Sequence, residues 1–316
     1  MRQVALIVNP ASGQLSAGHG KAIRQALEAL RGAGVEAEAL TTNGPGTAGE
    51  LAVQAVGRGC DTIIACGGDG TVHEIVQTLV GTPVALGVIP LGTANALASN
   101  LGLRGSPART VGKLLVAVPV RVSVGRMSYR DAAGKARSRY FTVAAGVGPD
   151  ALLLSRLDPA LKRRFGYFLY MVEGFRVWAT DSFPLFEAAF ADPGSSNPRV
   201  EQISQLLAVR IRNFGGVLNN LVPGATLRND GLRLIAFKTS SRLSYFRFLL
   251  AVLFGRQTFS REIELLDAAS VECRFRDGSS PRIFAEADGE LLGGLPVKLD
   301  IVPQALTLLI PPGAHP

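Results

Sequence analysis

Residues 67–71 read Gly-Gly-Asp-Gly-Thr, and this pattern can do phosphate chemistry. Glycine lets backbone amides approach an anion closely, and a helix beginning here would add partial positive charge. The pattern therefore predicts a phosphate-binding turn built on Gly67, Gly68 and Gly70. Because the Asp69 carboxylate would repel a bare phosphate, we expect a bridging Mg²⁺ beside it.

The flanking residues predict a strand that passes into a helix. Residues 61–65 form a short apolar run, typical of a strand buried on both faces. Apolar residues then recur at helical spacing, which predicts a helix beginning near Thr71. Thr71 and Glu74 form a T-x-x-E capping box, and Thr47 with Glu50 forms a second one. We therefore expect Glu74 at the phosphate end of its helix.

Two more polar loops follow predicted strands. Residues 9–13 read Asn-Pro-Ala-Ser-Gly after the strand 4–8, and residues 90–95 read Pro-Leu-Gly-Thr-Ala-Asn after the strand 84–89. Alternating strands and helices predict a parallel sheet with helices on both faces, whose ligands lie beyond the carboxyl ends of the strands. One such loop is more often structural than functional, but three at one edge predict a ligand site.

The second half of the sequence predicts strands without alternating helices, which favours an antiparallel β-sandwich. We place the α/β domain at 1–119 and the sandwich at 120–303. The expected strands are Val120–Tyr129, Arg139–Ala145, Leu185–Phe190, Leu206–Arg212, Leu232–Lys238, Val271–Arg276, Ile283–Ala287 and Val297–Val302.

The three loops together resemble the nucleotide-binding domain of the diacylglycerol kinase and sphingosine kinase family. The Gly-Gly-Asp-Gly-Thr element alone is shared with NAD kinases and, more loosely, with phosphofructokinases. The resemblance implies a three-layer α/β domain like that of NAD kinases and phosphofructokinases. It also implies that a C-terminal strand at about 304–316 returns to this domain. It also implies ATP, with its phosphates over the glycine turn. Residues of the same motifs would contact the nucleotide: Asn9, Pro10, Ser12, Gly13, Thr71, Glu74, Gly92, Thr93 and Asn95.

The resemblance further implies acidic site residues in the second domain. Asp288-Gly289-Glu290 follows the strand 283–287, where a hairpin turn would explain Asp-Gly by itself. The family pattern instead places an acidic group at the interdomain cleft. Asp288 would then orient the lipid hydroxyl or accept its proton, Glu290 would support Mg²⁺, and Asp69 would organise the metal and the phosphates. Asp230 matches a family Asp-Gly linked to a metal, in a role more structural than catalytic.

The net charge of +8 lies mainly in the second half, which holds 25 of the 33 basic and 18 of the 25 acidic residues. Two segments there, 161–178 and 238–261, mix basic with aromatic residues, and such helices can lie in an anionic membrane interface. The alternative is that their apolar faces are sandwich core. Nucleic acid is disfavoured because the aliphatic run 249–253 offers neither stacking nor phosphate contacts.

No apolar run approaches the roughly 20 residues that a membrane-spanning helix needs. The three cysteines, at 60, 66 and 273, have no C-x-x-C spacing, which favours a reducing compartment. We therefore expect a cytoplasmic protein peripherally associated with membranes. The sequence leaves open whether it forms a homo-oligomer.

These observations predict an ATP- and Mg²⁺-dependent kinase that phosphorylates a hydroxyl of a membrane lipid of diacylglycerol or sphingoid type. One alternative is a soluble NAD kinase-like phosphotransferase, favoured by residues 67–71 alone. Another is a non-catalytic nucleotide- or lipid-binding homologue. It is suggested by Ala96, because bacterial diacylglycerol kinases of this type usually have aspartate at that position.

Overall fold

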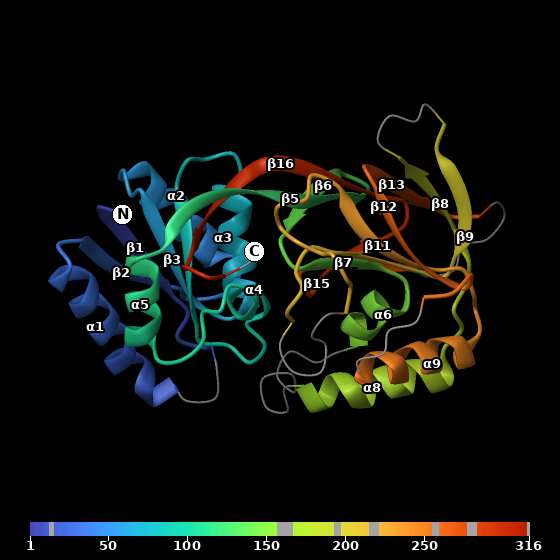
Figure 1. Ribbon diagram of the computed structural model, residues 1–316, viewed down its shortest axis with the longest axis horizontal. Helices are drawn as coiled ribbons and strands as arrows, with labels where there is room; N and C mark the ends of the chain where they lie inside the picture. The colour runs from blue at the N-terminus through green and yellow to red at the C-terminus, as the bar shows by residue number, and fades with distance from the viewer. Residues whose placement is uncertain are drawn as a thin grey trace. The chain divides into compact units, whose positions relative to one another are not determined.

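The computed structural model in Figure 1 describes residues 1–12, 16–156, 167–192, 197–214, 221–254, 259–276 and 283–314. The chain divides into two compact units. Unit 1 comprises Met1–Ser123 with Pro303–Pro316, and unit 2 comprises Val124–Val302. Among the described helices, none has the length and apolar character needed to span a bilayer.

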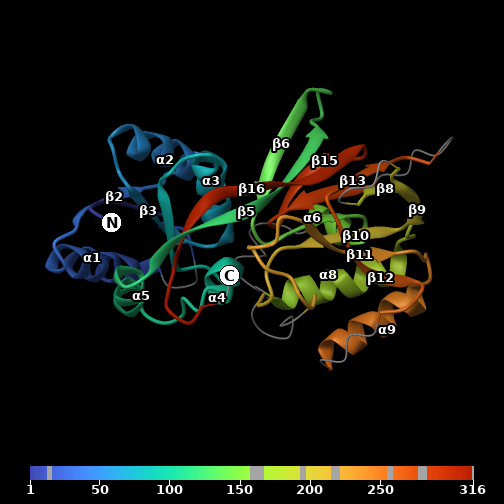
Figure 2. The ribbon, with the colours of Figure 1, turned by 45° about the horizontal axis from the view of Figure 1, so that its top comes forward.

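Unit 1 is the predicted three-layer α/β domain. Its sheet has the strand order β2-β1-β3-β4-β16, and all of these neighbours are parallel. Helices α2 and α3 pack together on one face, and α1 and α5 pack together on the other (Figure 2). The strands are β1 (Gln3–Val8), β2 (Glu36–Thr41), β3 (Thr62–Gly67), β4 (Ala85–Pro90) and the end of β16 (Val297–Ile310). The helices are α1 (Ser16–Gly32), α2 (Thr47–Gly57), α3 (Asp69–Leu79), α4 (Ala96–Asn100) and α5 (Pro107–Leu115).

The central strands of unit 1 are buried on both faces. Every residue of β3 is buried, and so are the first five of β4, as expected for apolar runs in a parallel sheet. Ile63 and Ile64 are fully excluded from solvent. Burying a side chain of this size contributes about 1.5–3 kcal/mol, so this core holds the loops at the carboxyl ends of the strands in place.

Unit 2 is the predicted antiparallel sandwich. One sheet has the order β12-β11-β10-β7-β14-β15; the other contains β13, β8 and β9 beside the first part of β16, with β5 paired to β6. Buried side chains from both sheets form one core, including Phe141, Phe186 and Leu234. The strands are β5 (Val118–Arg130), β6 (Ala136–Phe141), β7 (Ala144–Val147), β8 (Phe186–Ala191), β9 (Arg199–Ile203), β10 (Gln205–Val209), β11 (Leu232–Phe237), β12 (Ile263–Ala268), β13 (Ser270–Arg274), β14 (Phe284–Ala287) and β15 (Glu290–Gly294).

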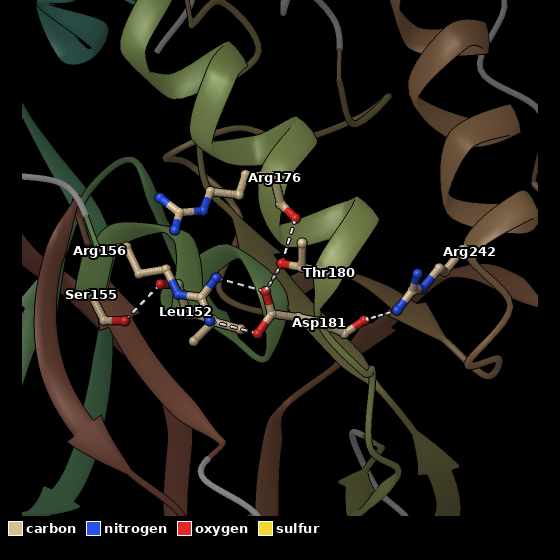
Figure 3. Close-up of polar contacts among 7 residues, drawn as sticks. All are labelled: Leu152, Ser155, Arg156, Arg176, Thr180, Asp181 and Arg242. Carbon is tan, nitrogen blue, oxygen red and sulfur yellow. Dashed lines mark hydrogen bonds and ion pairs between the residues drawn. The ribbon is translucent and has the colours of Figure 1, made fainter.

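Three helices of unit 2 contact one another in succession: α6 (Pro149–Arg156) packs on α8 (Tyr167–Thr180), and α8 is hydrogen-bonded to α9 (Arg242–Leu253). The Arg242 guanidinium donates to the carbonyls of Ala179 at 2.6 Å and Asp181 at 2.8 Å, at the end of α8. Arg156 forms two hydrogen bonds of 2.6 Å with the Asp181 carboxylate, and Arg176 lies beside it (Figure 3). The Arg156 hydrogen bond lowers the pKa of Asp181. These contacts join the three helices to one another.

The inner face of α9 is buried, but not in the core between the two sheets that one interpretation of segment 238–261 predicted. Phe248 and Val252 pack with Phe237 in a separate cluster on the other face of β11. Tyr245 stacks on Phe237 of β11 with ring centroids 4.6 Å apart, and Phe248 meets the same ring edge-on at 5.2 Å. The outer face of α9 exposes other large apolar side chains, among them Leu243 and Leu249. Of the other predicted segment, residues 161–166 lie outside the described residues.

Both predicted capping boxes are wrong. Helix α3 begins at Asp69, two residues before Thr71, and neither α3 nor α2 has a side-chain cap at its N-cap glycine. Glu74 instead reaches the start of α2, where its two oxygens accept from the amides of Gly46 at 2.7 Å and Ala48 at 3.0 Å. The box pattern failed because packing of α2 against α3 gives Glu74 a closer set of donors than its own helix.

The predicted strand 139–145 is also wrong as a single element. Strand β6 ends at Phe141 and β7 begins at Ala144, because the backbone between them turns to bind a carboxylate described below. Strands β9, β12 and β15 and helices α5 and α6 were not predicted. Their short segments carry charged residues or glycines that weaken the apolar periodicity.

Replacing Glu74 by alanine should loosen the start of α2, because the Gly46 and Ala48 amides would lose their acceptor. A lost helix cap costs about 1 kcal/mol. Hydrogen exchange should therefore become faster at these two amides. Glu50→Ala is the matched control from the first turn of α2 and should change little. Faster exchange in Glu50→Ala than in Glu74→Ala would restore the capping-box prediction.

Candidate active site

The three predicted loops of unit 1 lie together at the carboxyl ends of β1, β3 and β4. The Asn9 side-chain amide donates to the Thr71 hydroxyl at 3.1 Å, and the Gly68 amide donates to the Ser12 hydroxyl at 3.3 Å. The Leu91 amide donates to the Gly67 carbonyl at 2.9 Å. These bonds connect the first loop to the second and the second to the third.

The Asp69 carboxylate connects the glycine turn to the third loop. Its two oxygens accept from the backbone amides of Asn95 at 2.9 Å and Ala96 at 2.7 Å. Asn95 has a φ of 49°, a left-handed conformation that asparagine tolerates better than most residues. The Asn95 side chain also bonds both backbone groups of Gly92, accepting at 2.9 Å and donating at 2.6 Å. Asp69 is therefore an organiser of this edge.

The glycines at this edge have different roles. A Cβ on Gly92 would lie 2.5 Å from the Gly68 Cα, and one on Gly67 would overlap the Thr71 side chain. Packing alone thus requires glycine at 67 and 92. A Cβ on Gly70, however, would meet nothing within 4 Å, and the backbone φ there is not positive. Gly70 has no packing reason to be glycine, which is consistent with an amide kept open to a ligand.

The other residues that the sequence predicted to contact the nucleotide differ in exposure and in their contacts. Ser12 and Thr71 are buried and brace the loops, whereas Pro10 and Thr93 are exposed. The Glu74 carboxylate accepts two amides at the start of α2, so it is directed to that helix and not to the three loops. Gly13 lies outside the described residues.

Asp288 occupies the two-residue hairpin between β14 and β15. Asp288 and Gly289 have φ values of 49° and 83°, so the predicted hairpin turn is present. The Asp288 carboxylate accepts from the amides of Thr142 at 2.9 Å, Val143 at 2.8 Å and Ala144 at 3.1 Å, and from the Thr142 hydroxyl at 3.2 Å. These four bonds fix its orientation at the break between β6 and β7.

Glu290 begins β15 and is partly exposed. Its neighbour Glu286, which was not singled out in the sequence, is buried and accepts from the Gly289 amide at 2.9 Å. Asp230 is exposed in the loop before β11. Among the described residues, no group of three His, Cys, Asp or Glu side chains could hold a metal ion. Mg²⁺ bound through phosphates needs only one or two carboxylates, so Asp69 still fits that role.

Asp150, in the first turn of α6, was missed by sequence reasoning. Its two carboxylate oxygens are buried, and neither has a hydrogen-bond partner among the described residues. Burial raises the pKa of Asp150 to about 7, although the nearby amides of Ala151 and Asp150 favour the charged form. A Cβ on Gly146 would overlap this carboxyl, so the glycine makes room for it. The sequence signal that could have identified Asp150 is its position directly after Gly-x-Gly-Pro.

Models of known protein families match both halves of the chain. Residues 3–127 match the diacylglycerol kinase catalytic domain, and residues 164–310 match the YegS C-terminal NAD kinase β-sandwich-like domain. A diacylglycerol kinase of Bacillus subtilis is 26% identical over 94% of this chain and 92% of its own. A probable YegS-like lipid kinase of Citrobacter koseri is 28% identical over 92% of this chain and 91% of its own.

A solved structure of a putative diacylglycerol kinase from Bacillus anthracis has the same fold. Its TM-score is 0.76 at 19% identity, and the match covers 99% of this chain and 98% of that one. Both domain matches and the full-length relatives agree with the motifs described above. The chain therefore belongs to the lipid kinase family that contains the diacylglycerol kinases and the YegS-like kinases.

Proposed function

We propose that this kinase transfers the γ-phosphate of ATP, with Mg²⁺, to a hydroxyl of a diacylglycerol- or sphingoid-type membrane lipid. The observation that carries the proposal is the edge of unit 1, where three polar loops are bonded together around Asp69. Phosphoryl transfer depends mainly on positioning and charge neutralisation, which suits amides and a helix terminus better than a covalent nucleophile.

The nucleotide would bind over the start of α3. The amide at Gly70, with the helix N-terminus, favours a polyphosphate. Mg²⁺ bound with ATP supplies neutralisation of the phosphate charge, and Asp69 is the carboxylate that would hold it. A carboxylate offers about four lone-pair sites, so accepting the two backbone amides is compatible with a metal contact.

Ala96 does not disturb this arrangement. Its contact with Asp69 is made by its backbone amide, which any residue except proline supplies. The departure from aspartate at this position therefore leaves the Asp69 contact intact. The non-catalytic alternative therefore rests only on the carboxylate that Ala96 does not supply.

Asp288 is the proposed acceptor of the lipid hydroxyl proton, and Glu290 the proposed support for Mg²⁺. A carboxylate offers about four lone-pair sites, and four donors already surround Asp288. To act as a base, Asp288 would have to exchange one of these bonds for the lipid hydroxyl. The longest of them is the Thr142 hydroxyl, which can rotate away.

The outer face of α8 and α9 is the proposed contact with an anionic membrane. Large apolar side chains on it are well exposed, with Phe175 at 64%, Leu243 at 60% and Leu249 at 50%. Exposed Arg247 adds positive charge, and α9 has no acidic residue. Exposed aromatic and aliphatic residues beside basic ones are typical of helices that lie in a membrane interface.

The direct test is transfer of labelled γ-phosphate from ATP to a panel of lipids and to NAD. We expect a lipid product, with kcat lower by about 10²–10⁴-fold in Asp288→Asn because a positioned base is lost. Thr142→Ala is the matched control, because it removes one hydrogen-bond donor to the Asp288 carboxylate and keeps the carboxylate itself. Near wild-type turnover in folded Asp288→Asn would remove Asp288 from the mechanism. Phosphorylation of NAD but of no lipid would overturn the proposed function.

The membrane contact can be tested by flotation with liposomes containing phosphatidylglycerol. The double variant Leu243→Glu/Leu249→Glu should weaken binding by about tenfold or more, because burying one leucine contributes about 1.5 kcal/mol or more. Val200→Glu, at an exposed apolar position on β9, is the control and should bind like the wild type. Activity on dispersed short-chain lipid should survive in all three proteins. Equal flotation of the double variant and the control would contradict this surface.

A further inference from the structure

Unit 2 contains a buried positive charge that the proposed reaction does not use. Arg210 follows β10, and its side chain is 1% exposed. Removing a charged group from water costs several kcal/mol unless the group is paired and hydrogen-bonded. The contacts that offset this cost therefore show what the residue does.

The Arg210 guanidinium is surrounded by carbonyls of a single loop, residues 227–231. One terminal nitrogen donates to the Gly231 carbonyl at 2.8 Å. The other donates to the carbonyls of Asn229 at 2.8 Å and Leu227 at 3.3 Å. Burial lowers the pKa of Arg210 to about 10, and the nearby Asp230 carboxylate opposes that shift, so the group stays charged at neutral pH.

Converging backbone carbonyls with a carboxylate nearby are the ligands that Mg²⁺ and Ca²⁺ take in proteins. The family resemblance links Asp230 to such a metal. Here the carbonyls of this loop converge on a guanidinium instead, and an arginine carries its charge without any dependence on the metal supply.

We infer that the guanidinium of Arg210 takes the place of a bound metal ion in the loop 227–231, with Asp230 as its counter-charge and not a metal ligand. The loop then keeps its shape at any concentration of divalent cation. This consequence rests on the proposed function: kinase activity would depend on Mg²⁺ only through the ion that binds with ATP.

Thermal unfolding without nucleotide tests the inference separately from catalysis. The wild type should unfold at the same temperature in EDTA, in millimolar Mg²⁺ and in millimolar Ca²⁺. Arg210→Ala should unfold about 5 °C or more lower, because three carbonyls lose their donors. Millimolar guanidinium ion should raise the Tm of Arg210→Ala and leave that of the wild type unchanged.

Arg233→Ala is the matched control, because Arg233 contacts the nearby Pro223 carbonyl and Asp267 from a more exposed position. Guanidinium should not restore its stability. The inference is overturned if Mg²⁺ or Ca²⁺ raises the wild-type Tm and Asp230→Asn abolishes the rise. It is equally overturned if Arg210→Ala unfolds like the wild type. Should Arg210→Ala fail to fold, the metal titrations of the wild type and Asp230→Asn decide the question.

Discussion

The hydrogen bonds from the Asn95 and Ala96 amides to the Asp69 carboxylate are the contact on which the nucleotide half of the proposed site depends. They hold the third loop against the glycine turn, whose own backbone bonds the first loop through Ser12. Without Asp69, the left-handed Asn95 would lose the bond to its backbone amide. The same carboxylate can therefore serve both the fold and a phosphate-bound metal.

A carboxylate that accepts backbone amides recurs elsewhere in this chain. Glu74 closes the start of α2, and Asp288 closes the break between β6 and β7. Arg210 is the cationic counterpart, because it donates to the backbone carbonyls of one loop. Charged side chains thus fix irregular backbone where no sheet or helix partner is present, and Asp69 and Asp288 are also the residues proposed for chemistry.

The sequence predicted the strands and turns that are determined by local residue patterns. Apolar runs such as residues 61–65 gave the strands of unit 1, and turn residues such as Asp288-Gly289 gave the hairpin. It could not predict contacts that depend on which elements become neighbours. Glu74 caps a different helix from its own. The Asp150 oxygens are buried on α6, which packs on β14, and Arg210 is buried against the loop 227–231. A charged residue in a sequence favours exposure, so the burial of these side chains is not predicted by residue type.

The central claim is that the edge around Asp69 holds the phosphates of ATP and is not merely a packed turn. Gly70→Ala tests it most directly, because the added methyl meets no protein atom and alanine favours the helix by up to about 1 kcal/mol. The measurement is the Tm together with the KM for ATP, with Gly112→Ala in α5 as the helix control. We predict that Gly70→Ala is no less stable than the wild type but has a KM for ATP raised by about tenfold, whereas Gly112→Ala keeps the wild-type KM. An unchanged KM in a stable Gly70→Ala would contradict the account.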